Sequence, residues 1–520
     1  MSDRIDRALY VAALLLGVLP LWVARHLPMV DLPQHLHLIS VLHRLDDPTT
    51  LYPQFFEARN TLTPYLGYYY AVSALNWLLP LETANRLFLS LYVAGLPLSL
   101  AFLLRALGRP RWPSLLALPF AYGDSFAWGF VNYCASLPLA LLCCGLFVLT
   151  LTQVPRRRTW APWLGVCLIA VLLFHVQAFF FLALGLPWLL LTTRVPEDSE
   201  ARDWRSRLKA RVPALLGVAP GVVLFLGWAA LRLAEPAEIA PGQPWKAWGP
   251  LLSEQNLATK SFEQNRDELF QVLANLFHDG SDRWPLYAVG AVALAGLVLS
   301  LVFRSPSPEG PVARFRLLGL GLIALLLYFV LPFDIRGYIY YLNTRYAHLA
   351  AALLIASVPV TLPAFQRRLL WASAACALLL GLVLGRGFRA FSREASELDA
   401  LTAATAPRPR LMGLIFESRS HVVRFPVYLH AATVLARARG GVTNFSFALT
   451  PHSPLRYQGA VPPTFPSEWR PDELDYEAQG RFYDHFLVRG AHPSRVFGAR
   501  LQSELAVVKQ VGDSWLVRRR

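Results

Sequence analysis

The chain has 520 residues, of which 55% are hydrophobic, and its mean hydropathy is +0.39. Soluble globular domains average roughly 45–50% apolar residues. The excess here gathers in runs of roughly 17–22 apolar residues, which are long enough to cross a ~30 Å hydrocarbon core as helices and too long for the strands of a membrane β-barrel. The formal charge of +15 would suit nucleic-acid binding, but the arginines lie mostly between the apolar runs, as in the loops of membrane proteins. The composition therefore indicates a helical protein of the lipid bilayer and argues against a nucleic-acid partner.

We expect eleven membrane-spanning helices, the first of them retained because no small-residue cleavage site follows it. Placing the arginine-rich loops in the cytoplasm makes successive spans alternate in direction and puts the N-terminus inside. The expected spans are residues 8–24, 87–105, 112–124, 135–152, 159–174, 178–193, 212–233, 285–303, 316–333, 346–364 and 368–386. The run at 61–80 also has the length of a span. Its tyrosines, with Trp77 and Asn76, suit the membrane interface better, so we expect a surface or re-entrant helix there.

The chain is expected to divide into a membrane part, 1–386, and a soluble α/β domain, 387–520, which eleven spans place outside the cell. Long outer loops are expected at about 25–86, 234–284 and 334–345, the second with an amphipathic helix at 263–277. In the soluble domain, alternating patterns predict strands at 411–416, 442–448, 485–488, 505–508 and 514–517, and a helix at 425–438 that Gly440 and Gly441 end. The predicted fold is thus an all-α polytopic membrane protein with outer juxtamembrane helices and a C-terminal α/β domain.

One carboxylate stands just after the first span. Residues 29–37 read Met-Val-Asp-Leu-Pro-Gln-His-Leu-His, with Asp31 as their only acid. This acid, the long first outer loop, the sizeable loop after the seventh span and the soluble C-terminal domain together resemble the GT-C superfamily of membrane glycosyltransferases. That superfamily includes protein O-mannosyltransferases, the aminoarabinose transferase of lipid A and oligosaccharyltransferases. Many of its members carry two acids close together, as Asp-Asp, Asp-Glu or Asp-x-Asp, whereas Asp31 is followed here by Leu32 and Pro33.

The resemblance implies transfer of a sugar from a polyprenyl-phosphate donor to an acceptor on the outer face of the membrane. Asp31 is the expected base, since glycosyl transfer must remove a proton from the acceptor hydroxyl. His35 lies on the same helical face and could orient that carboxylate. Asp124 lies in the turn after the third span, the second outer loop, where some family members carry an acid that joins the first in holding a divalent metal; with Asp31 it would hold Mg²⁺ or Mn²⁺. The simpler readings are a helix N-cap for Asp31, a solvated interfacial side chain for His35 and a turn residue for Asp124.

Four further residues are candidates for the donor phosphate. Arg336 and Arg345 lie in the third outer loop, and an arginine fork can bind two phosphate oxygens of the leaving group. Tyr346 follows Arg345 at the start of a span, and His175 stands at the outer turn of a very apolar pair of spans. Interfacial anchoring of the arginines and a water-facing turn position for His175 are the alternatives.

The sequence therefore predicts a hexosyl- or pentosyltransferase of a bacterial inner membrane that acts in the cell envelope on a saccharide, lipid or protein acceptor. A lipid or saccharide transporter is one alternative, although most spans carry no central charge and paired inverted repeats are not evident. A catalytically silent scaffold for envelope assembly is the other. The polar candidates favour an active site because all of them fall on one side of the membrane.

Overall fold

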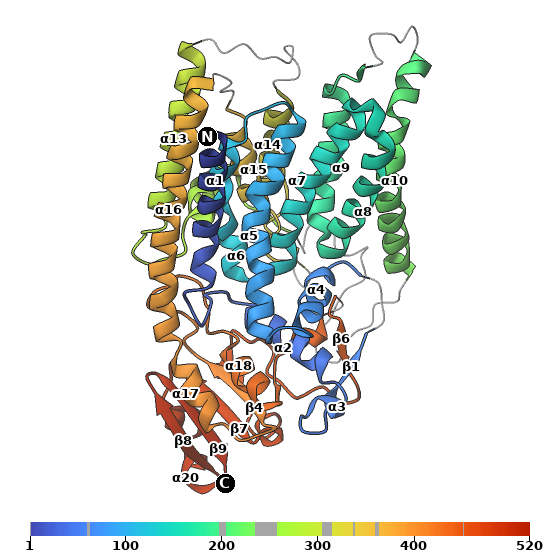
Figure 1. The fold of residues 1–520 in the computed structure, drawn as a ribbon. Helices are drawn as coiled ribbons and strands as arrows, with labels where there is room; N and C mark the ends of the chain where they lie inside the picture. The colour runs from blue at the N-terminus through green and yellow to red at the C-terminus, as the bar shows by residue number, and fades with distance from the viewer. Residues whose placement is uncertain are drawn as a thin grey trace.

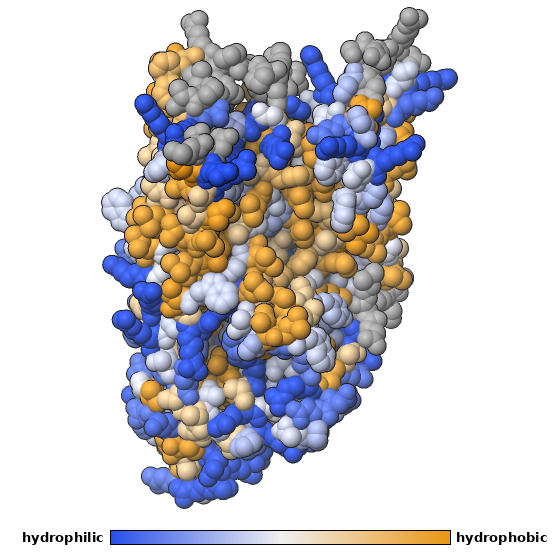
Figure 2. Space-filling model, in the orientation of Figure 1, coloured by the Kyte–Doolittle hydropathy of each residue, from blue (hydrophilic) through white to orange (hydrophobic). Residues whose placement is uncertain are grey.

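The computed structural model describes residues 2–59, 63–196, 204–234, 257–303, 315–335, 339–358, 363–450 and 452–520. It consists of a bundle of long helices with a mixed α/β domain at one end (Figure 1). The N-terminus lies toward the opposite end of the bundle from the C-terminal domain. Figure 2 shows apolar side chains gathered around the middle of the bundle and polar ones at both ends, the distribution expected of a protein that crosses a bilayer.

Six described helices are long and apolar enough to cross a membrane, and three more are apolar but shorter. The six are α5 (Leu81–Ala106), α7 (Val131–Thr152), α8 (Arg157–Phe174), α10 (Trp204–Ala234), α13 (Arg283–Val302) and α16 (Pro363–Glu394). The shorter ones are α9 (Val176–Thr192), α14 (Arg316–Val330) and α15 (Arg345–Ala356). Together with α1 (Ser2–Val18) and η2 (Trp112–Tyr122), they coincide with the eleven predicted spans. The helical multi-span architecture is confirmed.

The segment expected to span at 112–124 departs from that expectation, because η2 (Trp112–Tyr122) is a 3-10 helix. Eleven residues at a rise of about 2.0 Å give only about 22 Å, less than the hydrocarbon core. Pro113 and Pro119 lack backbone N–H groups and disfavour regular α-helical bonding. The predicted helical segment is therefore present, but as a 3-10 helix and not as a regular α-helix.

Several short elements lie between the helical bundle and the C-terminal domain (Figure 1). They are α2 (Leu32–His43), α3 (Tyr52–Phe55), β1 (Phe56–Ala58) and α4 (Gly67–Asn76). Ten residues of α4 extend about 15 Å, which is too short to span a bilayer. The expectation that 61–80 does not form a spanning helix is therefore confirmed for its described part, 63–80.

The C-terminal domain holds a five-stranded sheet in the order β5-β4-β7-β9-β8. The strands are β4 (Arg410–Ile415), β5 (Val442–Thr443), β7 (His485–Arg489), β8 (Leu505–Val511) and β9 (Ser514–Arg519). Strand β4 runs parallel to β5 and β7, whereas β9 is antiparallel to both of its neighbours. Its helices are α17 (Glu397–Ala404), α18 (Ala431–Arg439), α19 (Pro493–Phe497) and α20 (Arg500–Ser503).

Two predicted boundaries in this domain change. Helix α18 begins at Ala431 rather than near residue 425, because turns at Val427, Leu429 and Ala431 precede its first regular turn. Gly440 ends it with φ +68°, as predicted. Strand β5 covers only two residues of the expected 442–448.

The domain is joined closely to the membrane part. Strand β1 of the first loop pairs antiparallel with β6 (Leu455–Tyr457) of the C-terminal domain.

Strand β2 (Leu257–Ala258) pairs with β3 (Asp334–Ile335), and α12 (Phe262–Leu273) follows with a capping box at Ser261. Helix α12 thus forms most of the helix expected at 263–277. Apolar residues of the bundle and the sheet share one continuous core.

Candidate active site

Asp31 is held against the short helix α6 (Asp124–Trp128). The backbone N–H of Asp31 donates to the carbonyl of Trp128 at 3.0 Å. Gly129 follows α6 with φ +88°, and a Cβ there would lie 2.9 Å from the amide nitrogen of Asp31. The close approach therefore requires glycine, and it places Asp31 at one end of a five-residue helix that Asp124 begins.

Asp31 occupies the N-cap position of α2, but its carboxylate makes no capping hydrogen bond. One oxygen, Oδ1, lies 3.3 Å from Nε2 of His430, and the side chain remains 19% exposed. Among the described residues, no other side chain is bonded to this carboxylate. The capping explanation thus accounts for the position of Asp31 and not for its side chain.

His430, just before α18, and Glu468 were not anticipated from the sequence. Nδ1 of His430 lies 3.5 Å from Oε2 of Glu468, so the imidazole stands between two carboxylates. Burial lowers the pKa of His430, but Glu468 and Asp31 outweigh that effect and raise its pKa overall. No local pattern signals this contact, because His430 and Asp31 are 399 positions apart.

The side chain of His35 is bonded to the aromatic surface helix and not to the carboxylate of Asp31, although the backbone N–H of His35 donates to the carbonyl of Asp31 at 3.1 Å. Its Nδ1 lies 2.7 Å from the hydroxyl of Tyr69. Burial lowers the pKa of His35 to about 4, even though the negative charge of Asp31 acts in the opposite direction. A neutral His35 at pH 7 supports Tyr69 and α4 (Gly67–Asn76) beside the site.

Asp124 faces a different set of charges. Its carboxylate interacts with the hydroxyl of Thr344 and with the positive charges of Arg345 and Lys260. The ammonium of Lys260 is itself paired with Glu268 at 2.5 Å. Asp124 is therefore part of the electrostatic surroundings of Arg345, rather than a turn residue in open solvent.

Arg345 and His175 lie together, as their predicted common role requires. Nη1 of Arg345 is 3.0 Å from Nε2 of His175 and donates to Oε1 of Gln177 at 3.1 Å. Nη2 donates to the carbonyl of Tyr340 at 3.0 Å, and the guanidinium carbon lies 4.0 Å from the ring centre of Phe130. Arg345 is only 7% exposed, so its charge is largely shielded from water.

The hydrogen bonds of this cluster are incomplete within the described part of the chain. Nε of Arg345 and Nε2 of Gln177 are buried donors without a partner there. Nδ1 of His175 accepts from the backbone N–H of Gln177 at 3.1 Å. A neutral imidazole that accepts at Nδ1 carries its hydrogen at Nε2, so that N–H and the N–H of Arg345 face each other. The N–H groups of Arg345, Gln177 and His175 thus converge on a place where a hydrogen-bond acceptor would satisfy them.

The two other residues predicted to bind the donor phosphate are Tyr346 and Arg336. Tyr346 donates its hydroxyl to the carbonyl of Gln177 at 2.9 Å, which ties α15 to the start of α9. Arg336 lies outside the described residues. Tyr65 covers His175, with ring centres 4.4 Å apart, and has the unusual backbone φ of +80°.

The turn after α6 contacts both halves of the site. The carbonyl of Trp128 accepts the backbone hydrogen bond from Asp31, and Phe130 packs under Arg345. Tyr341 stacks on Trp128 with ring centres 4.5 Å apart and has φ +57°. Tyr65 and Tyr341 are two of the three described non-glycine residues with positive φ. Such strained backbone tends to gather at functional sites.

The fit of a divalent metal to Asp31 and Asp124 is poor. The described residues contain no group of three or more His, Cys, Asp and Glu side chains that could hold a metal. One oxygen of Asp31 is already bonded to His430. A divalent ion prefers about six oxygen ligands, and these two carboxylates supply few of them. Metal dependence stays a prediction, and no step below passes through a metal.

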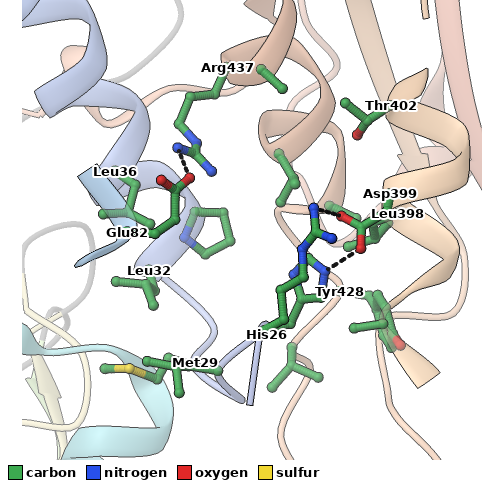
Figure 3. Close-up of a pocket in the computed structure, with 18 of the residues that line it drawn as sticks. His26, Met29, Leu32, Leu36, Glu82, Leu398, Asp399, Thr402, Tyr428 and Arg437 are labelled. Carbon is green, nitrogen blue, oxygen red and sulfur yellow. Dashed lines mark hydrogen bonds and ion pairs between the residues drawn. The ribbon is translucent and has the colours of Figure 1, made fainter. Parts of the chain in front are cut away.

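A cavity of about 260 Å³ lies between the bundle and the C-terminal domain. Residues of α2 and α18 form part of its lining. Figure 3 shows the ion pair of Arg437 with Glu82 on one wall and that of His26 with Asp399 on the other. Leu32 and Leu36 of α2 lie beside the first pair. Neither Asp31 nor Arg345 lines this cavity.

No protein-family model matches the chain, and no curated protein has a similar sequence. Solved structures do share its fold. ArnT from Cupriavidus metallidurans bound to undecaprenyl phosphate aligns with a TM-score of 0.57 at 11% identity, over 98% of this chain and 97% of that one. The apo state of ArnT gives 0.54 at 12% identity, over 99% and 98%. The mycobacterial arabinofuranosyltransferase AftD gives 0.47 at 14% identity and covers all of this chain, which spans 40% of AftD. The expected GT-C resemblance is confirmed as a likeness of fold.

Proposed function

We propose that this protein is a membrane glycosyltransferase that moves a hexose or pentose from a polyprenyl-phosphate donor to an acceptor. The observation that carries the proposal is the buried group of donors at Arg345, His175 and Gln177. A phosphate oxygen would satisfy the unpartnered N–H groups and would separate the two N–H groups that now face each other. ArnT, which shares the fold, has been solved with undecaprenyl phosphate bound.

The chemistry follows from where charge develops. The acceptor hydroxyl attacks the anomeric carbon, and the carboxylate of Asp31 takes its proton. The bond between that carbon and the phosphate oxygen breaks, and polyprenyl phosphate leaves with the electron pair. Arg345 stabilises the leaving phosphate more strongly than it would in water, because its guanidinium is desolvated and held by fixed contacts.

The positions of the two halves suit this division of work. Asp31 and Arg345 both contact the turn that ends α6, so the base and the phosphate site are fixed relative to each other. Reacting groups must approach to about 3–3.5 Å, and a common rigid support favours such an approach.

We further propose that the site faces the outside of a bacterial inner membrane, with the N-terminus in the cytoplasm. The arginine-rich loops support this orientation through the positive-inside rule. The lipid tail of the donor would lie in the bilayer beside the apolar helices, and the acceptor would come from the cell envelope.

Binding of undecaprenyl phosphate to the full-length protein in nanodiscs tests the phosphate site. Arg345→Lys should weaken binding about 10-fold or more, because lysine lacks the two-donor fork. Arg157→Lys is the matched control: Arg157 is also a buried arginine at the start of an apolar helix, but at the opposite end of α8 from His175. Equal effects of the two substitutions would refute the phosphate assignment.

Transfer is tested with undecaprenyl-phosphate mannose and undecaprenyl-phosphate arabinose, each radiolabelled in the sugar, and bacterial envelope membranes as the acceptor source. The wild-type protein should transfer label from one of them, and Asp31→Asn should reduce transfer at least 100-fold. Binding of the lipid without any transfer would favour a carrier or scaffold over an enzyme. Wild-type rates with Asp31→Asn would remove Asp31 from the mechanism.

A further inference from the structure

The contact between Asp31 and His430 joins the membrane part to the C-terminal domain. Asp31 belongs to the first loop, and His430 immediately precedes α18 of the domain. His430 is 4% exposed, so its partners are protein groups rather than water. Nε2 faces Asp31 at 3.3 Å, and Nδ1 faces Glu468 at 3.5 Å.

Gln34 forms hydrogen bonds with the groups of the C-terminal domain that surround this imidazole. Gln34 is 1% exposed, and its Oε1 accepts from the backbone N–H of Phe447 at 3.4 Å. Its Nε2 donates at 3.1 Å to the hydroxyl of Thr433 and at 3.1 Å to the carbonyl of Phe445. All three partners belong to the C-terminal domain. These hydrogen bonds fix the position of the C-terminal domain relative to α2, within one helical turn of Asp31.

The hydrogen on His430 that faces Asp31 does not depend on the charge of the imidazole. A charged imidazole carries hydrogens on both nitrogens. A neutral one carries its hydrogen on Nε2 when Nδ1 accepts, here from a protonated Glu468 at 3.5 Å, since both amide hydrogens of Gln34 are donated to Thr433 and Phe445. In both cases Nε2–H is the donor and Oδ1 of Asp31 is the acceptor.

A carboxylate that acts as a base needs one free oxygen in a fixed direction. The bond from His430 uses Oδ1 and stops the carboxylate from rotating, which leaves Oδ2 available to the acceptor hydroxyl. A capping bond to α2, which would also restrain the carboxylate of Asp31, is absent. His430 supplies the missing restraint.

We propose that His430 is a positioning residue for Asp31, contributed by the C-terminal domain, and that Glu468 orients the imidazole. The inference rests on the proposed glycosyl transfer and adds the C-terminal domain to the active centre. The domain therefore does more than shape the approach of the acceptor, because the base is correctly held only when the domain is docked.

Turnover in the transfer assay described above tests this role. His430→Ala should lower the rate at saturating donor about 10- to 100-fold, as is usual for a residue that orients a reacting group, and should leave the donor KM within about 2-fold. His430→Gln places an amide N–H near the position of Nε2 and should recover most of the loss. Glu468→Gln should have a smaller effect, about 2- to 10-fold.

A matched control separates positioning from simple docking of the domain. Glu57→Gln removes the ion pair of Glu57 with Arg456, which joins the same loop and the same domain at 2.6 Å but lies away from Asp31. It should leave turnover within about 2-fold. If His430→Ala behaves like this control, or if alanine and glutamine at 430 are equally damaging, the positioning role is refuted.

Two results distinguish failure of this inference from failure of the proposed function. The double variant Asp31→Asn with His430→Ala should be no slower than Asp31→Asn alone, because His430 acts through Asp31; multiplied defects would overturn the inference while leaving Asp31 as base. In addition, the ¹⁵N resonance of the imidazole, assigned by its loss in His430→Gln, should shift in Asp31→Asn. An unchanged resonance refutes the contact whether or not transfer is detected.

Discussion

Replacing Gln34 with methionine should loosen the C-terminal domain from the bundle. Methionine has a similar volume, so the change removes hydrogen bonds without opening a large cavity. The carbonyl of Phe445 keeps a bond from the hydroxyl of Thr443 at 2.7 Å. The backbone N–H of Phe447 and the hydroxyl of Thr433 lose the partner that Gln34 provides.

Each buried polar group left without a partner costs about 1–3 kcal/mol. Two such groups give about 2–6 kcal/mol, which corresponds to roughly a 30- to 25,000-fold increase in opening between α2 and α18. Hydrogen–deuterium exchange of the full-length protein in nanodiscs would measure this opening, and peptides of α18 should exchange faster by that factor.

Gln54→Met provides the control, because Gln54 is an exposed glutamine in the same loop. It should leave the exchange of α18 unchanged. If Gln34→Met also changes the exchange of α18 by less than about 2-fold, the bonds around Gln34 do not hold the domains together, and the reasoning from unsatisfied groups is refuted.

Three further predictions concern single positions. Gly129→Ala should reduce sugar transfer at least 10-fold and lower stability by about 1–2 kcal/mol, since φ +88° disfavours alanine and the new methyl group would press on Asp31. His37→Leu should stabilise the protein more at pH 5 than at pH 8. Burial lowers the pKa of His37 to about 4, so between pH 6.5 and pH 4 the unfolded chain binds a proton that the folded protein does not. The wild type therefore loses about 2 kcal/mol of folding stability by pH 5, and the leucine variant does not. Tyr65→Gly should speed association of undecaprenyl phosphate a few-fold, because it removes both the ring over His175 and the cost of φ +80°.

Each of these has a direct measurement. Transfer assays and thermal unfolding test Gly129→Ala, and wild-type values would mean that the approach to Asp31 is not tight. Unfolding at pH 5, 6, 7 and 8 tests His37→Leu, and a gain independent of pH would contradict a depressed histidine pKa. Stopped-flow binding tests Tyr65→Gly, with Tyr65→Phe as a control that keeps the ring; similar rates for the two would show that the ring does not limit entry.

The helices could be predicted from the sequence because their signal is local. An apolar run of sufficient length predicts a buried helix wherever it occurs, and eleven runs correspond to eleven helical segments. The exception, η2, carries two prolines within eleven residues, which disfavour regular α-helical bonding without excluding it, since α10 stays α-helical with Pro213 and Pro220 inside it. Interior prolines of α5 and α7 did not have this effect, since the long apolar helices around them continue on both sides.

The site was only partly accessible to the same reasoning. Charge in the loops placed Arg345 and His175 on one side of the membrane, and the structure brings them into contact. The partner of Asp31 could not be found in this way, because His430 lies in a separate domain and carries no motif. Likewise, the sequence offers no sign that His35 would bond to Tyr69 and leave the carboxylate to another histidine.

The length of α6 fixes how the two carboxylates are arranged. Asp124 begins this five-residue helix, and the backbone of Asp31 is bonded to its last residue, Trp128. One inserted residue would turn Asp124 by about 100° and move it about 1.5 Å along the helix axis, away from Thr344 and Arg345. Proteins descended from a common ancestor with this chain should therefore vary the loops around α6 freely while keeping its five residues and the glycine that follows.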